Sequence, residues 1–141
     1  MLEVYDLLEE FYHYKSKLDK LLKFTPFYAM KEDDFYDPLT PKSISNCVSG
    51  GLYCANKVKD LNITDPINII NENIRQKCIF NNYNPDIYFQ YMINFHKECM
   101  NKTIRLMFNS TCSDIVFSIL KIDSETIKTC IASSFNGICF L

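Results

Sequence analysis

The sequence predicts a mainly α-helical fold braced by disulfide bonds, and three observations support this prediction. Apolar residues recur at spacings of three and four along most of the chain, the period of an amphipathic helix. The 141 residues include only three glycines, fewer than glycine-rich phosphate loops or repetitive β architectures need. The chain also carries seven cysteines, an unusually high number for a reducing compartment. We therefore expect short helices that are cross-linked to one another.

Composition excludes several classes of function. Fifteen lysines and arginines are scattered among 17 acidic residues, giving a net charge of -2 and no basic stripe, so nucleic acid is not an expected partner. No apolar run approaches the roughly 18 residues that a membrane-spanning helix needs, so we expect no transmembrane segment within this chain. The length is typical of one domain.

The first 46 residues predict a helix, a strand and a loop. Residues 2–22 have the apolar spacing of one long amphipathic helix. Residues 23–30 are apolar and aromatic with Pro26 among them, which favours a short or edge strand. We thus expect residues 1–30 to form a helix and a strand. Residues 31–46 are acidic and contain two prolines, so they are expected to form a loop and a boundary.

The remainder predicts a cysteine-rich helical subdomain over residues 47–135 and a tail over residues 136–141. Between Cys47 and Cys54, the pair Gly50-Gly51 supplies a tight turn, across which a disulfide is feasible. Residues with capping side chains then mark four helix starts. These are Thr64-Asp65 before Pro66, Asn84 before Pro85, Ser110 or Thr111, and Asp123-Ser124, with Gly137 as a helix stop.

The remaining cysteines lie on the apolar stripes of these helices. Cys78 follows Ile74 by four residues and Cys99 follows Phe95 by four, so both point inward. No Cys-x-x-Cys pair occurs, which argues for structural disulfides and against a zinc ribbon or a thioredoxin-type active site. Spacing alone does not determine the pairing beyond Cys47 and Cys54.

Three Asn-x-Thr sequons predict glycosylation at Asn62, Asn101 and Asn109. Together with the cysteines, they favour an oxidising lumen of the secretory pathway. Residues 1–10 are acidic and amphipathic and do not resemble a signal peptide, so we expect the chain to be a fragment or a mature form.

The sequence offers little for catalysis or metal binding. Its two histidines, His13 and His96, are far apart, and the cysteines are too widely separated for a four-thiolate zinc site. The acids of residues 31–46 do not follow the EF-hand pattern. His96 lies three residues before Cys99, but we interpret it as an ordinary histidine and not as part of a nucleophile pair. We expect no catalytic residue, no metal and no cofactor.

The stripe of aromatic residues between Tyr88 and Phe95 has two interpretations. Core packing explains a stripe at this spacing, and a peptide-binding groove is the alternative.

The segment from Cys47 to Cys130 resembles the central luminal region of vacuolar sorting receptors, which carry cargo in the late secretory pathway. The resemblance extends over roughly residues 4–132. It is carried by Cys47–Ala55 (Cys-Val-Ser-Gly-Gly-Leu-Tyr-Cys-Ala), Glu72–Cys78 (Glu-Asn-Ile-Arg-Gln-Lys-Cys), Tyr88–Cys99, Ser118–Lys121, Cys112 and Cys130, with Phe24–Tyr28 similar to the strand ahead of the cysteine loop.

This resemblance implies a thioredoxin-like fold interrupted by a disulfide-braced helical insertion. Residues 1–30 would supply only a partial thioredoxin-like α/β element, because the closing strands are absent from the sequence. The cysteines that match the family, and are therefore expected in three disulfides, are Cys47, Cys54, Cys78, Cys99, Cys112 and Cys130. Cys139 lies outside the family pattern and is expected to be a free thiol.

The resemblance also implies a non-enzymatic luminal module that binds, or helps to bind, cargo proteins. These proteins would be delivered to a vacuole or a lysosome-like compartment. The expected partners are cargo proteins, neighbouring domains or other subunits. The expected location is the Golgi, endosomal or vacuolar lumen, or the extracellular face of a membrane protein.

Two alternatives stay open. The cysteine loop also resembles that of the lysosomal thiol reductases of the thioredoxin superfamily, which predicts a thiol-disulfide oxidoreductase, although such an enzyme needs a Cys-x-x-Cys that this chain lacks. The other alternative is a structural subunit of a luminal or extracellular assembly.

Overall fold

The structure is a computed structural model that describes residues 2–18, 23–28, 47–48, 53–54, 67–100 and 108–134. These residues are mainly helical, as the sequence predicts. The α-helices are α1 (Leu2–Leu18), α2 (Ile67–Asn82), α3 (Pro85–Phe95), α4 (Ser110–Leu120) and α5 (Ser124–Ser133). A π-helical segment, η2 (His96–Met100), continues α3. The strands β1 (Cys47–Val48) and β2 (Tyr53–Cys54) pair antiparallel, with Cys47 opposite Cys54.

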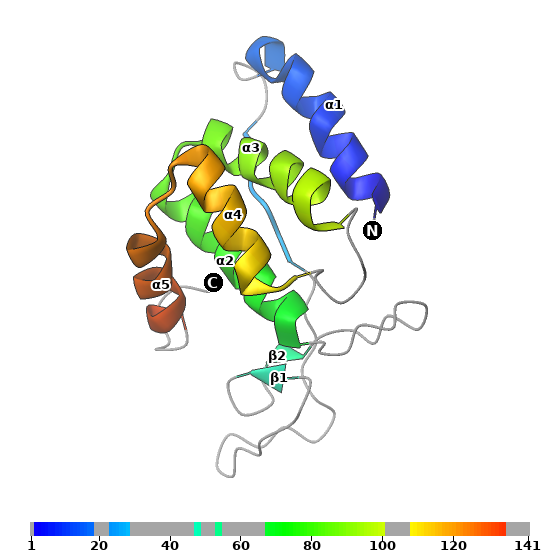
Figure 1. The fold of residues 1–141 in the computed structure, drawn as a ribbon. Helices are drawn as coiled ribbons and strands as arrows, with labels where there is room; N and C mark the ends of the chain where they lie inside the picture. The colour runs from blue at the N-terminus through cyan, green and yellow to red at the C-terminus, as the bar shows by residue number, and fades with distance from the viewer. Residues whose placement is uncertain are drawn as a thin grey trace.

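Helix α2 lies at the centre of the described part of the chain (Figure 1). It packs against α3, α5 and the β1–β2 hairpin, while α3 also packs against α1 and α4. Ile70 and Ile74 are buried along one side of α2, and Ile79 is buried along another. A helix with apolar residues on more than one side belongs inside a bundle, so α2 organises the other helices around it.

Three disulfides connect these elements. Cys47–Cys54 closes the hairpin, Cys78–Cys130 joins α2 to α5, and Cys99–Cys112 joins η2 to α4. They contain the six cysteines that the sequence assigns to disulfides. Cys139 lies outside the described residues.

Two of the predicted helix starts are confirmed. The side chain of Asn84 accepts a hydrogen bond from the N–H of Ile87 at 3.0 Å, and Pro85 is the first residue of α3. The carboxylate of Asp123 accepts from the N–H groups of Glu125 and Thr126, each at 3.2 Å, and so caps α5. The predicted caps at Thr64 and Asp65 lie outside the described residues.

The prediction that Ser110 or Thr111 caps the next helix is wrong, because Asn109 occupies that position. Its backbone is extended and its Oδ1 accepts from the N–H of Thr111 at 3.0 Å. Its own carbonyl then accepts the first helical hydrogen bonds, from Cys112 and Ser113. Three consecutive residues of α4's start have capping side chains, and only the backbone conformation selects among them.

The short strand predicted over residues 23–30 is absent from the part that the structure describes, residues 23–28. The ring of Phe24 instead packs on the helices, with its centroid 4.8 Å from that of Phe89. Pro26 is buried, and the Tyr28 hydroxyl lies 3.0 Å from the hydroxyl of Tyr88. Phe24 therefore packs against α1, α2 and α3, and Tyr28 contacts α3, whereas Phe27 is 91% exposed.

The helix that the sequence predicts after Asn84 extends through Cys99, but its last turn is π-helical and not α-helical. Cys99 and Met100 are both buried in that turn. The aromatic stripe that precedes it is core: Tyr88, Phe89, Tyr91 and Phe95 are each at most 2% exposed. The loop predicted over residues 31–46, the tail over residues 136–141 and the helix stop at Gly137 lie outside the described residues.

Candidate functional site

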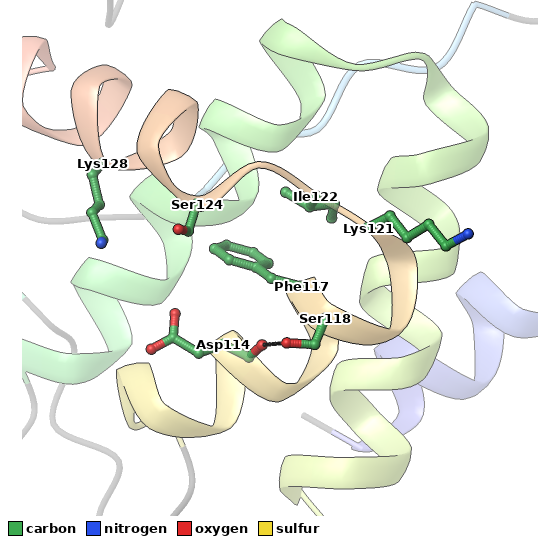
Figure 2. A pocket seen from close by; sticks show the side chains of 7 residues that line it. All are labelled: Asp114, Phe117, Ser118, Lys121, Ile122, Ser124 and Lys128. Atoms are coloured by element: carbon green, nitrogen blue, oxygen red, sulfur yellow. Dashed lines mark hydrogen bonds between the residues drawn. The ribbon is translucent and has the colours of Figure 1, made fainter.

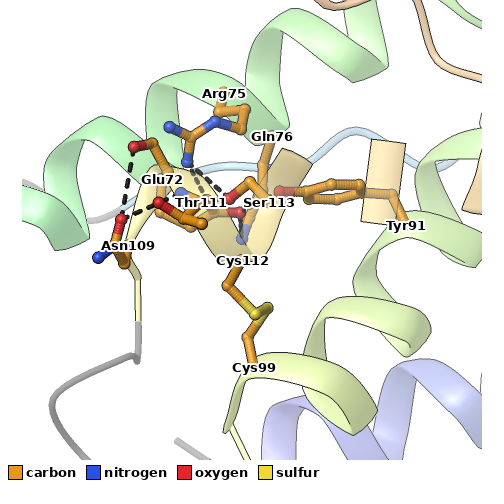
Figure 3. Close-up of a disulfide and its surroundings, with 10 residues drawn as sticks. Glu72, Arg75, Gln76, Tyr91, Cys99, Asn109, Thr111, Cys112 and Ser113 are labelled. Carbon is orange, nitrogen blue, oxygen red and sulfur yellow. Dashed lines mark hydrogen bonds and ion pairs between the residues drawn. A yellow bond between two sulfur atoms is a disulfide. The ribbon is translucent and has the colours of Figure 1, made fainter. Parts of the chain in front are cut away.

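The most concentrated chemistry in the described residues is a buried carboxylate, that of Glu72 in α2. Its Oε1 accepts hydrogen bonds from Gln76 at 3.0 Å and from the hydroxyl of Tyr91 at 2.9 Å. Its Oε2 accepts from Ser113 at 3.0 Å and forms an ion pair with Arg75. Figure 3 shows these side chains converging from α2, α3 and α4. We call these five residues the Glu72 network.

Burial makes the Glu72 network electrostatically strong. Glu72 and Ser113 are 0% exposed, and Arg75 is 8% exposed. Burial, the largest single influence, lowers the pKa of the Arg75 guanidinium, but the charge and hydrogen bond of Glu72, together with Tyr91 and Asp114, raise that pKa above its ordinary value. Burial, and then the negative charge of Glu72, raise the pKa of the Tyr91 phenol well above its ordinary value. Arg75 therefore stays charged and Tyr91 stays neutral over the physiological range.

The Glu72 network adjoins a disulfide. Ser113 directly follows Cys112, whose sulfur is bonded to that of Cys99 (Figure 3). Arg75 also donates to the Ser113 hydroxyl at 3.0 Å, so α4 is tied to α2 through two side chains. Because the carboxylate is enclosed and both of its oxygens accept two partners each, the arrangement fixes three helices to one another and offers no access to a ligand.

A surface pocket of about 370 Å³ lies between α4 and α5. The ring of Phe117 sits among the side chains that surround it (Figure 2). Lys121 and Lys128 supply positive charge, and Asp114 supplies negative charge. The pocket is lined by Asp114, Phe117, Ser118, Lys121, Ile122, Ser124 and Lys128. Such a mixture of one aromatic ring, hydroxyls and charges suits a polypeptide segment better than an apolar small molecule.

A second pocket of about 300 Å³ is more apolar. It is lined by Phe11, Lys15, Leu18, Lys23, Phe24, Phe80, Pro85 and Phe89. Lys15 at its edge forms an ion pair with Asp86 at 3.1 Å, which connects α1 to the start of α3.

The cysteines of the described residues are not arranged for thiol catalysis. All six sulfurs are in disulfides, so neither Cys99 nor Cys112 carries a thiolate. The ring of His96 stacks on that of Tyr5, with centroids 5.0 Å apart, and does not activate Cys99. Among the described residues, no three His, Cys, Asp or Glu side chains are close enough together to hold a metal ion.

None of the helices that the structure describes combines the length and the apolar character that crossing a bilayer requires.

Of the three sequons, only Asn109 is described, while Asn62 and Asn101 lie outside the described residues. Asn109 is partly exposed at the start of α4, and its Oδ1 faces the helix as the cap. Figure 3 shows its nitrogen directed away from the helix. An N-linked glycan is attached through that nitrogen and leaves the oxygen free to accept, so a glycan and the cap are compatible at this residue.

Expression in a secretory host tests this site. Asn109→Asp should lose one glycan while keeping the cap, whereas Asn109→Gln should lose the glycan and also about 1 kcal/mol of stability. Gel mobility with and without glycosidase measures the first effect, and thermal unfolding of the deglycosylated proteins measures the second. An unchanged mobility for Asn109→Asp would show that Asn109 is not glycosylated.

The segment containing Glu72, Arg75 and Gln76 carries part of the family resemblance, but its buried hydrogen-bond network was not predicted from the sequence. A signal was available, since these three residues share a helical side with the apolar Ile79. Polar residues on a side that also carries a core residue indicate burial, but the partners Tyr91 and Ser113 come from other helices and have no local signal.

The sequence was compared with family models, curated proteins and solved structures. A family model described as "Vacuolar sorting receptor thioredoxin-like domain" matches residues 3–137. No curated protein and no solved structure matches the chain significantly.

Proposed function

The chain belongs to the vacuolar sorting receptor thioredoxin-like domain family, and on that premise we propose that it is a non-enzymatic luminal module that binds cargo proteins. The cargo would be soluble proteins on their way to a vacuole or a lysosome-like compartment. The binding would be reversible and would involve no covalent step.

The disulfides are the observation that carries this proposal. Cys78–Cys130 and Cys99–Cys112 join helical segments to one another, and Cys47–Cys54 closes the hairpin. Five of these six cysteines are buried, and Cys130 is partly buried. Bridges of this kind persist in an oxidising compartment, which supports a location in the secretory lumen. The six sulfurs committed to such bridges stabilise the fold and are not available as thiolates for exchange, which supports a binding role over an oxidoreductase.

The pocket between α4 and α5 is the surface that we assign to cargo. It is open to solvent and offers both polar and apolar groups, as a polypeptide ligand requires. The cap of Asp123 and the disulfide Cys78–Cys130 hold α5 in place beside it, so the pocket is preorganised.

Capture of luminal proteins tests the function. The oxidised chain, immobilised and exposed to the contents of secretory vesicles, should retain soluble proteins that elute reversibly. The affinity of one purified ligand is then measured for Ser118→Tyr, which fills the pocket, and for the control Thr129→Tyr, which places the same ring at an exposed position of α5 outside the pocket lining.

We expect Ser118→Tyr to weaken binding at least about tenfold, equivalent to 1.4 kcal/mol, and Thr129→Tyr to leave it unchanged. Retention of a fixed set of proteins in constant proportions would contradict cargo binding and favour an assembly subunit. Equal binding by both variants would place the cargo surface elsewhere on the chain.

A further inference from the structure

Helix α1 has large apolar side chains on its outward surface. Val4 is 55% exposed, Leu7 is 66% exposed and Tyr14 is 59% exposed. The inward side of the same helix already supplies the contacts with the core, through Tyr5 and the partly buried Leu8, Phe11 and Tyr12. The apolar arc of α1 is thus wider than its packing against α3 requires.

Three exposed residues of α1 and two partly buried ones at the border of the core follow the spacing of a two-helix interface. The partly buried ones are Leu18 and Phe11, and the ring of Phe11 also contacts those of Phe24 and Phe89. Val4, Leu7, Phe11, Tyr14 and Leu18 are separated by three, four, three and four residues. This alternation is the spacing of the a and d positions of a heptad, which form the seam between paired helices. We call these five residues the α1 stripe. In Figure 1, α1 lies at the edge of the described part of the chain, with α3 along one of its sides.

The charges of α1 are divided between its two halves. Residues 2–10 contain four acidic residues and no basic one, while residues 11–18 contain two lysines and a histidine and no acidic residue. This order complements the dipole of the helix itself. Glu9 and Lys15 pair with Lys97 and Asp86 of the same chain, but Asp6, Glu10 and Lys17 are exposed. The helix is therefore complementary to a reversed copy of itself, because antiparallel pairing places these acidic residues against the lysine.

We propose that the α1 stripe binds the α1 stripe of a second copy of this chain, with the two helices antiparallel. The heptad positions give the register: Leu7 packs against Leu18 of the second copy, and the solvent-exposed part of Phe11 packs against Tyr14 of the second copy. Glu10 and Lys17 both flank the stripe on its solvent side and are exposed. In this register, each Glu10 lies beside Lys17 of the second copy, and these flanking charges set the antiparallel orientation.

The expected association is weak. A helix of 17 residues is about 26 Å long, and one pair of such helices provides an interface at the small end of specific interfaces. The dimer should therefore form reversibly with a dissociation constant in the micromolar range. The α1 stripe is separate from the pocket between α4 and α5, so this inference does not depend on the proposed function.

Sedimentation of the full chain over a series of concentrations tests the pairing. The unmodified chain should show a concentration-dependent dimer, and Leu7→Glu should remain a monomer throughout. Ile119→Glu is the matched control, because Ile119 is 51% exposed on α4 and lies outside the α1 stripe. The proposal would be overturned if the unmodified chain is a monomer at every concentration. It would also be overturned if Leu7→Glu and Ile119→Glu reduce the dimer fraction equally.

Charge exchange separates pairing from folding. Glu10→Lys brings two lysines together and Lys17→Glu brings two glutamates together, so each variant alone should dimerise at least about tenfold more weakly. Mixing the two variants in equal amounts restores opposite charges at both contacts, and the mixture should dimerise like the unmodified chain. If the mixture stays monomeric while both variants fold normally by circular dichroism, the proposed register is wrong.

Discussion

Replacing Glu72 with glutamine is expected to reduce the free energy of unfolding by about 3–5 kcal/mol, the largest effect of any single substitution considered. The substitution removes a charge from a site that is 0% exposed and leaves the Arg75 guanidinium buried without its counterion. It also converts a group that accepts four hydrogen bonds into one that cannot accept all of them. Thermal unfolding should show a midpoint lower by about 10 °C or more.

Glu125→Gln is the matched control for this experiment. Glu125 forms an ion pair with Lys128 at 2.7 Å, but both side chains are more than half exposed and solvent screens their charges, so its loss should change the free energy of unfolding very little. A double variant, Glu72→Gln with Arg75→Met, should be more stable than the sum of the two single effects predicts. An unfolding midpoint for Glu72→Gln equal to that of Glu125→Gln would contradict a structural role for the Glu72 network.

Removing the Cys78–Cys130 disulfide has the second-largest expected effect. The bridge spans 52 residues, so its loss frees more chain entropy in the unfolded state than the loss of either other bridge. The expected cost of Cys78→Ala with Cys130→Ala is about 4 kcal/mol. Denaturant unfolding measured without reductant reports this quantity.

The other two bridges provide the comparison. Cys99–Cys112 spans 13 residues and Cys47–Cys54 spans seven, so alanine pairs there should cost about 3 and about 2 kcal/mol. Each of the three double alanine variants removes one disulfide bond and its two sulfur atoms. The informative result is therefore the order of their three losses in the free energy of unfolding. A smaller cost for Cys78–Cys130 than for Cys47–Cys54 would contradict the account of α5 as a helix fixed to α2 by this bridge.

The parts of the fold that the sequence predicts correctly depend on neighbouring residues. Asn84 before Pro85 and Asp123 before Ser124 satisfy helix N–H groups within the next three residues, so their role can be inferred from the local sequence. The helical period of the apolar residues likewise reports which side of each helix faces the core.

The parts that the sequence does not predict depend on residues far apart along the chain. Four cysteines in α2, η2, α4 and α5 allow three pairings, and the packing of α2 against α5 selects Cys78 with Cys130. The strand expected over residues 23–30 is absent from residues 23–28 for the same reason, because the ring of Phe24 packs against rings from three helices. The Glu72 network also combines residues from three helices, so no local pattern contains its geometry.

Peptide mapping of the chain purified from a secretory host, without reduction and after alkylation, tests the central claim most directly. The account predicts three cystine peptides, which join Cys47 to Cys54, Cys78 to Cys130 and Cys99 to Cys112, and a single alkylated cysteine at Cys139. Alkylation of more than one of the six paired cysteines, or a bridge between any other two of them, would contradict a luminal module held together by these disulfides.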